Sequence, residues 1–186
     1  MNTDFEAFIA LFPSMNLPFR ATHDSMTYFD GNLLKDIPKP LYDKFICANG
    51  IKCKSDYCAD KFFYGFKSLF KFYFSKDFYT ILAAIDNEAG CEEKCYLITY
   101  APSGEFIEQM LVFGTVSLKR PSKSDKSTSN VDVQSVINNK KIKVVHRTYD
   151  YDNNNELIKD IKKTSEYMVQ PDGKFKLINE KTEIIK

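Results

Sequence analysis

The sequence of 186 residues contains no tryptophan and only two histidines, and neither sign of charge dominates it. The 26 Lys and Arg residues nearly balance the 25 Asp and Glu residues, which leaves a net charge of +1. This balance argues against a nucleic-acid-binding protein, because such proteins usually carry a broad positive field. No run of about 18 apolar residues occurs, so we expect no transmembrane helix.

The first residues, Met1–Glu6, contain neither the basic segment nor the apolar segment of a signal peptide. We therefore expect a cytoplasmic protein. The alternative is a periplasmic protein or an outer-membrane lipoprotein from which a leader has been removed.

The five cysteines are an odd number, which excludes a fully paired set of disulfides within one chain. Cys47, Cys53 and Cys58 lie close together in the sequence, and Cys91 and Cys95 flank a short acidic turn. Because no C-x-x-C pair occurs, we expect reduced thiols in a reducing compartment rather than a zinc site. A Cys53–Cys58 or Cys91–Cys95 disulfide is the alternative for an exported protein.

Aromatic residues are abundant, with 16 Phe and 11 Tyr, and they favour strands over helices. The N-terminal part nevertheless contains two helix patterns. Thr3 and Glu6 form a capping-box pattern ahead of a phenylalanine stripe, which predicts a helix over Asp4–Leu11 that packs on a sheet. The segment Leu41–Cys47 predicts a second short helix, which ends near Gly50.

From Phe62 onwards, segments rich in β-branched and aromatic residues alternate with turn sequences. Two turns, Ala101–Gly104 and Gln170–Gly173, share an X-Pro-Ser/Asp-Gly pattern that is typical of hairpins. We therefore predict an α+β fold that is predominantly antiparallel β: a meander of about seven to nine strands with one or two short N-terminal helices packed on it. The predicted strands are 62–69 leading into 70–74, then 78–85, 94–100, 105–118, 131–138, 141–150, 164–169 and 174–179, with an extended edge segment at 16–22.

A single domain over residues 1–186 is expected, with a helical and irregular part at 1–61 and the meander at 62–186. The segment Glu156–Met168 fits a helix nearly as well as a strand, and we predict a long strand because a turn and a strand partner lie on each side. The polar segment Lys119–Asn130 is expected to be a solvated surface loop. Contact between this loop and an acidic partner is the alternative.

None of the common catalytic or nucleotide-binding motifs occurs in the sequence. His23, Asp24 and Ser25 are adjacent, and neighbours in an extended chain point to opposite sides, so they cannot form a triad among themselves. His146 lies in a predicted strand, where a lone histidine is usually structural. We therefore predict no catalytic, cofactor-binding or metal-binding residue, no cofactor and no enzyme.

One segment resembles the start of a calcium-binding loop, with Asp150, Asp152 and Asn154 at alternate positions. Asn155 suits the left-handed position that glycine usually takes. Ile161, however, stands where the loop needs a bidentate glutamate. We therefore interpret the segment as an ordinary turn.

Several segments spread over the chain carry a resemblance to a known group of proteins. They are Phe12–Phe19, Ile37-Pro38 ahead of Phe45, Cys95–Gly104, Lys141–Val144 through Tyr149 with Tyr167, and Asp172–Phe175. In these segments the chain resembles uncharacterised proteins from Bacteroidetes-type bacteria that are often predicted to be lipoproteins. The resemblance implies a fold pattern and a cell-envelope location, and it brings no known activity.

The absence of a catalytic pattern leads us to expect a non-enzymatic domain whose partner is another protein, and not nucleic acid. One concrete form is an immunity protein that neutralises a bacterial toxin. A first alternative is an exported, lipid-anchored accessory protein of the envelope. A second is a small-ligand binder or enzyme that uses a cleft on the sheet, lined by aromatic residues such as Tyr64, Phe66, Tyr73 and Tyr79. Core packing explains these aromatic residues more simply.

Overall fold

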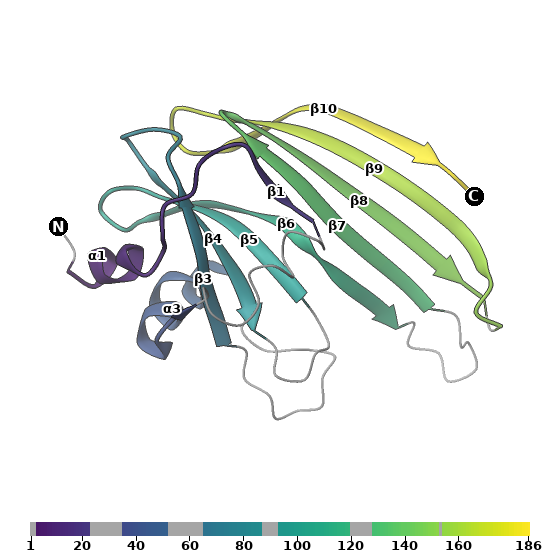
Figure 1. The fold of residues 1–186 in the computed structure, drawn as a ribbon, viewed down its shortest axis with the longest axis horizontal. Coiled ribbons are helices and arrows are strands. Elements are labelled where there is room, and N and C mark those ends of the chain that lie inside the picture. The colour runs from purple at the N-terminus through teal and green to yellow at the C-terminus, as the bar shows by residue number, and fades with distance from the viewer. Residues whose placement is uncertain (1–2, 23–34, 52–64, 87–92, 120–127, 153) are drawn as a thin grey trace.

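The computed structural model describes the chain except for residues 1–2, 23–34, 52–64, 87–92, 120–127 and 153. One open ten-stranded sheet dominates the fold, and two short helices lie beside its N-terminal strands (Figure 1). The helices are α1 (Thr3–Ala10) and α3 (Lys39–Phe45), followed by a 3-10 turn at Cys47–Asn49. The strands are β1 (Phe19–Ala21), β2 (Lys35–Asp36), β3 (Gly65–Phe72), β4 (Tyr79–Asp86), β5 (Glu93–Tyr100), β6 (Phe106–Lys119), β7 (Thr128–Asn138), β8 (Lys141–Tyr151), β9 (Leu157–Val169) and β10 (Phe175–Ile184).

The predicted antiparallel meander is confirmed, because β3 to β10 pair in sequence order, each with the next. Where two segments were predicted at 62–69 and 70–74, the structure has the single strand β3 over Gly65–Phe72, in which the register shifts between Ser68 and Phe70. The N-terminal part adds two short strands to the sheet: β2 pairs with β3, and β1 pairs with β7.

The uncertain segment Glu156–Met168 forms strand β9, as predicted, and not a helix. Its backbone pairs with β8 on one side and with β10 on the other. From Ile161 to Met168 two neighbouring strands satisfy its backbone hydrogen bonds, which outweighs the helical spacing of its apolar residues. None of the described helices is long and apolar enough to cross a membrane.

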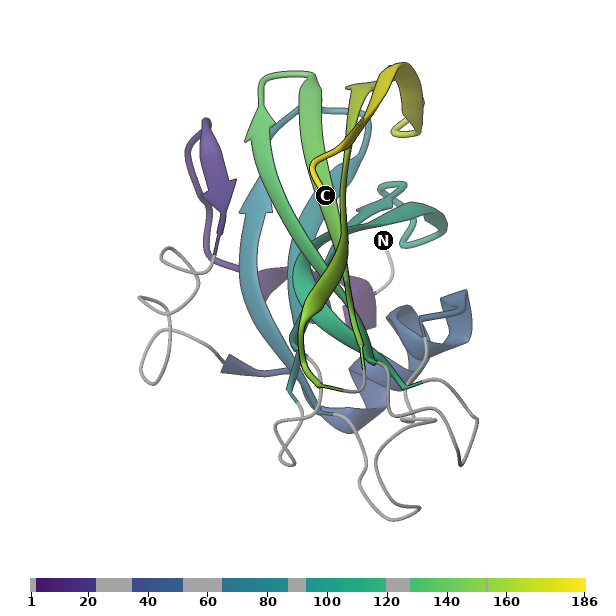
Figure 2. The same cartoon turned by 90° about the vertical axis from the view of Figure 1, so that its right-hand side faces the viewer.

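The sheet curls because β6 pairs with different partners along its length (Figures 1 and 2). The segment Phe106–Thr115 pairs with β5, and the segment Gly114–Lys119 pairs with β7. Gly114, at the change of partner, has φ of +151°, a value that side chains disfavour. The curl brings buried residues of β3–β6 against those of β1, β7 and β8, and together they form one of two hydrophobic cores.

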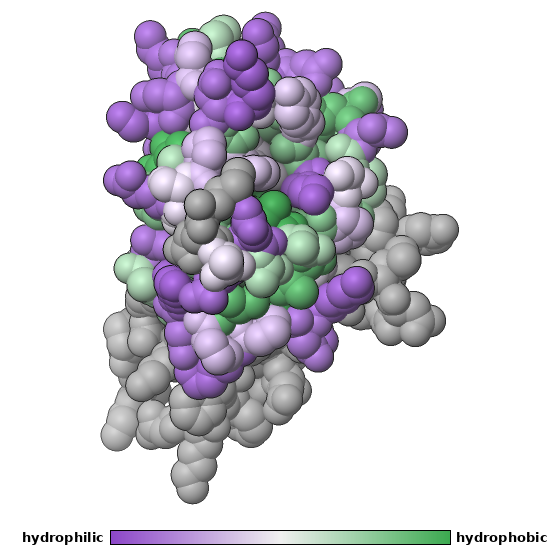
Figure 3. All heavy atoms as spheres, turned by 90° about the vertical axis from the view of Figure 1, so that its left-hand side faces the viewer, coloured by the Kyte–Doolittle hydropathy of each residue, from purple (hydrophilic) through white to green (hydrophobic). Residues whose placement is uncertain are grey.

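The second core lies between the helices and the opposite face of β3–β5. The phenylalanine stripe of α1 is buried there, as predicted, and the Phe8 ring stacks on Phe45 of α3 with centroids 4.9 Å apart. Tyr100 of β5 is fully buried between them and donates a hydrogen bond of 2.5 Å to the carbonyl oxygen of Phe45. The surface on this side of the molecule mixes polar with apolar side chains (Figure 3).

Both X-Pro-Ser/Asp-Gly turns form hairpins, as predicted, and their glycines adopt left-handed conformations. Gly104 has φ of +90° and Gly173 has φ of +83°. A Cβ atom at Gly104 would lie 2.8 Å from Cγ of Phe5, and one at Gly173 would lie 3.0 Å from Cδ1 of Ile107. The turns therefore require glycine for backbone conformation and also for close packing.

Strands β7–β10 extend beyond the hydrophobic core and away from the helices (Figure 1). In β8, buried and exposed residues alternate up to Val144, and every residue from Val145 to Tyr151 is only half-buried. We call the face of β7–β10 that is turned away from the core the outer face. Strand β10 forms the last strand of the sheet.

Candidate functional site

A hollow of about 470 Å³ lies on the outer face, where β1, β7, β8, β9 and the end of the chain meet. Its lining alternates with core residues, because successive residues of a strand point to opposite faces. On β8, for example, Lys143, Val145, Arg147 and Tyr149 line the hollow. The complete lining is Arg20, Thr22, Asp132, Gln134, Ser135, Val136, Lys143, Val145, Arg147, Tyr149, Lys162 and Ile185.

An ion pair joins Arg147, which lines the hollow, to Asp160. Nε and Nη2 of Arg147 donate hydrogen bonds of 2.9 and 2.7 Å to the two carboxylate oxygens of Asp160. This two-bond contact raises the pKa of Arg147 and lowers that of Asp160. The side chain of Asp160 is only 4% exposed, whereas that of Arg147 is 40% exposed. The carboxylate therefore holds the guanidinium in one orientation, and the remaining N–H groups of Arg147 can donate to a partner.

Further contacts order the surroundings of Arg147. The guanidinium carbon of Arg147 lies 5.0 Å from the centre of the Tyr149 ring. Burial raises the pKa of the Tyr149 hydroxyl. Nε2 of Gln134 donates a hydrogen bond of 2.9 Å to Asp132. The backbone of Asp160 is held in turn, because its N–H donates to the carbonyl oxygen of Lys186 at 2.9 Å. The result is a rigid polar surface beside apolar side chains such as Val145.

His146 points to the other face of the sheet and does not line the hollow. Burial and the charge of Lys163 lower the pKa of His146, and the charge of Glu180 opposes them. Glu180 accepts a hydrogen bond of 3.1 Å from Ser165 and lies 2.9 Å from Nζ of Lys163. The charged groups that act on His146 are thus the ammonium of Lys163 and the carboxylate of Glu180. His23, Asp24 and Ser25 lie outside the described residues.

Of the two described cysteines, one differs from the expectation of a reduced thiol and one agrees with it. Cys47 is disulfide-bonded, so the prediction of a reduced thiol is wrong at this position. Cys95 is buried and forms no disulfide, which confirms a reduced thiol there and excludes the alternative Cys91–Cys95 disulfide. Cys53, Cys58 and Cys91 lie outside the described residues. Across the described part of the chain, no three His, Cys, Asp or Glu side chains gather where they could hold a metal ion.

The segment that resembles a calcium loop forms the turn between β8 and β9. Oδ1 of Asp152 accepts hydrogen bonds of 2.8 Å from the backbone N–H groups of Asn154 and Glu156. Asn155 has φ of +63°, the left-handed conformation expected from the sequence. The Asp152 carboxylate thus caps backbone donors, as turn residues do.

The aromatic residues considered for a cleft do not gather around the hollow. Phe66 is buried and Tyr79 packs against the core beneath the helices. Tyr73 is 77% exposed in the turn after β3, and Tyr64 lies outside the described residues. Most of the predicted loop Lys119–Asn130 also lies outside them, since residues 120–127 are not described.

No known protein family, curated protein or solved structure matches this chain. The resemblance to Bacteroidetes-type proteins therefore stays a hypothesis. Arg147 and Tyr149 were missed as candidate residues, although their spacing of two in a predicted strand places them on one face. The sequence carries no comparable signal for Asp160, because its contact with Arg147 depends on the register between β8 and β9.

Proposed function

We propose that the chain is a non-enzymatic domain that binds another protein through the outer face of β7–β10. The observation that carries this proposal is the Arg147–Asp160 ion pair, which holds an exposed guanidinium rigidly beside Tyr149 in an open hollow. Arginine and tyrosine are the residue types most often found at the energetic centres of protein interfaces. A guanidinium that is already oriented loses less conformational entropy when a partner binds.

The shape of the hollow favours a protein over a small molecule as the partner. Its volume falls within the range of roughly 300–1,000 Å³ that is typical of ligand pockets. Such pockets enclose most of their ligand, whereas this hollow is open. An immunity protein that covers a toxin is one specific form of this proposal.

Export to the cell envelope is the second candidate, and Cys47 favours it. Disulfides persist in oxidising compartments and are rare in a reducing cytoplasm. The disulfide at Cys47 therefore supports the alternative of an exported accessory protein. Protein binding through the outer face is compatible with either compartment.

Photo-crosslinking in cells of the source organism tests the binding face. The photoreactive amino acid p-benzoylphenylalanine replaces Tyr149 in one variant and Tyr73, exposed in the turn after β3, in a matched control. We expect a discrete protein adduct from the Tyr149 variant that an excess of unmodified protein suppresses, and none from the Tyr73 variant. Equal adducts from both positions, or none from Tyr149 in a folded variant, would contradict the proposal. Inhibition of a toxin by the unmodified protein would identify the immunity form.

A further inference from the structure

Strand β10 presents a long unpaired edge. It pairs with β9 on one side, and none of the described strands pairs with its other side. Of its residues, those from Lys176 to Thr182 are all exposed. In Figures 1 and 2 it lies at the rim of the sheet. The N–H and C=O groups along such an edge are available to water or to another strand.

Exposed apolar side chains concentrate at this same rim. The described residues include seven exposed large apolar side chains, and six of them lie in β9, in β10 or directly after β10. The seventh is Tyr73. Scattered apolar residues on a surface need no explanation, but a group along one open edge marks a surface that another element covers. The six are Ile158, Met168, Leu177, Ile178, Ile184 and Ile185.

We propose that two copies of the chain form a two-fold symmetric dimer in which their β10 strands pair antiparallel. A two-fold axis through Thr182 places Lys181 opposite Glu183 of the partner subunit, and the symmetry repeats this contact. Lys181 and Glu183 lie on one face of the strand, where their side chains are already 2.6 Å apart within one chain. Opposite charges at directly opposed positions stabilise an antiparallel pair, and like charges destabilise it.

Four other two-fold registers are less favourable. An axis through Glu180, Lys181 or Glu183 would place that residue opposite its own copy and so oppose like charges. An axis through Ile178 would pair Lys176 with Glu180 of the partner subunit. That register crosses the point where the β9–β10 pairing shifts, between Leu177 and Asn179. From Asn179 to Ile184 the pairing with β9 is continuous, so the edge is regular around Thr182.

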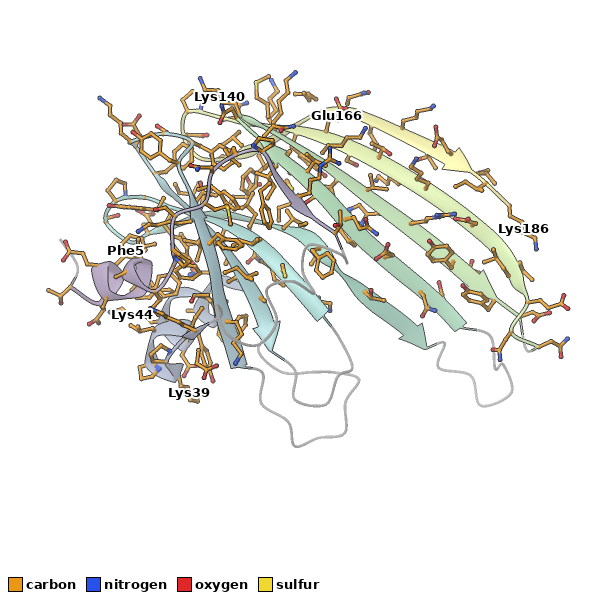
Figure 4. All side chains as sticks on the ribbon, viewed as in Figure 1. Phe5, Lys39, Lys44, Lys140, Glu166 and Lys186 are labelled. Carbon is orange, nitrogen blue, oxygen red and sulfur yellow. The ribbon has the colours of Figure 1, made fainter. Side chains whose placement is uncertain are left out.

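The symmetry of this dimer has a consequence for the outer face. An axis perpendicular to the sheet keeps the outer faces of both copies on the same side. The two hollows would then open in one direction, with β10 and its copy between them. The end of the chain at Lys186 lies beside this seam (Figure 4). A partner with two matching sites would bind both hollows at once and gain avidity.

Sedimentation equilibrium of the full chain over a range of concentrations tests the proposal. The variants are K181E, E183K and the charge swap K181E/E183K. K76E, in the exposed turn between β3 and β4, is a control with the same change in charge. We expect a dimer whose dissociation constant rises about tenfold in each single variant, because two attractive contacts become repulsive. The charge swap restores the wild-type dissociation constant, and K76E leaves it unchanged.

Urea denaturation of each variant separates this effect from a loss of folding, because an exposed ion pair contributes little to the stability of the monomer. A wild-type chain that stays monomeric at high-micromolar concentration would overturn the proposal. A dimer that neither single variant weakens, or that the charge swap fails to restore, would exclude the register through Thr182. Neither result depends on the crosslinking of the outer face, so the two proposals stand or fall separately.

Discussion

Arg147 and Asp160 show how single residues acquire a role through the sheet. Asp160 lies opposite Tyr149 in the β8–β9 register, and Arg147 lies opposite Lys162, so the two charges meet across a diagonal. The bridge buries the carboxylate and leaves the guanidinium accessible. A buried carboxylate needs its partner, because an uncompensated charge inside a protein is costly. This dependence makes Asp160 a sensitive reporter of the outer face.

Replacing Asp160 by asparagine should change the dependence of stability on pH. The pKa of Asp160 is lowered in the folded state by its hydrogen bonds with Arg147, so the folded state favours the ionised form. This stabilisation is fully present above the ordinary aspartate pKa of about 4 and is lost as the pH falls through the lowered value. We expect D160N to have a lower urea midpoint than the wild type at pH 7, and the difference to shrink by pH 3.

The control for this experiment is D172N, in the exposed turn before β10. In this variant, the amide oxygen of the new asparagine can still accept the hydrogen bond that the backbone N–H of Lys174 donates to Asp172 in the wild type. The urea midpoint of D172N should follow that of the wild type at both pH values. A difference between D160N and the wild type that is the same at pH 7 and pH 3 would contradict the role given to the ionised carboxylate.

Tyr100 is the residue that ties α3 to the sheet. We expect Y100F to lower the free energy of unfolding by about 1 kcal/mol, because the carbonyl oxygen of Phe45 loses one of its two donors, Tyr100, while the ring packing is kept. Urea denaturation at neutral pH measures the change. An unchanged stability would show that the hydrogen bond from Nδ2 of Asn49, 2.8 Å from the same carbonyl oxygen, is enough to satisfy it.

At the scale of elements, the two hairpin turns join distant parts of the chain. Phe5 of α1 packs against the turn at Gly104, and Phe78 and Ile107 pack against the turn at Gly173. In addition, Oγ1 of Thr99 in β5 donates a hydrogen bond of 2.9 Å to the carbonyl oxygen of Gly173. These turns therefore fix the position of α1 and of the β9–β10 hairpin on the body of the sheet.

The variant G104A should lower the free energy of unfolding by about 2–3 kcal/mol, through an unfavourable positive φ and a collision with Phe5. G50A is the matched control, because Gly50 also has a positive φ but nothing lies within 4 Å of its missing Cβ. G50A should cost about 1 kcal/mol, from the backbone alone. Urea denaturation compares the two variants, and equal losses would show that the Phe5 contact adds nothing.

At the scale of the whole molecule, one part of the sheet is covered on both faces, and another part lies outside the two cores. The strands β3–β6 are covered by the helices on one face and by the curled sheet on the other. In β8, no residue after Val144 is buried, and this part of the strand lies away from the helices (Figure 1). The hollow and the open edge of β10 both belong to the part of the sheet that lies outside the two cores.

Native-state hydrogen exchange should follow this division. The backbone amides of Leu97 and Ile98 in β5 should exchange only through global unfolding, because both faces of that strand are buried. The amides of Thr148 and Tyr149 should exchange faster through local opening, although β8 is paired on both sides. Exchange measured by NMR in deuterated buffer distinguishes the two groups. Equal protection would mean that the sheet opens as one cooperative unit.

The sequence alone determined the fold class, the two helices, the hairpin turns and the antiparallel meander. These features depend on neighbours in the chain: the spacing of apolar residues, the backbone conformation of glycine and proline, and the β-branched and aromatic content of each segment. The prediction of a strand at Glu156–Met168, whose apolar spacing also fits a helix, followed from the turns on each side of it. The disulfide at Cys47 did not follow, because pairing depends on which thiols approach in space.

Only the tertiary structure decided where the candidate surfaces lie. The contact between Arg147 and Asp160 needs the exact register of β8 and β9, and a shift of one residue would turn Asp160 to the other face. The curl at Gly114 decided which face of β7–β10 is buried, and the end of the meander decided that β10 is the open edge. Register and curvature result from the sum of many contacts between distant residues, and no local pattern in the sequence encodes that sum.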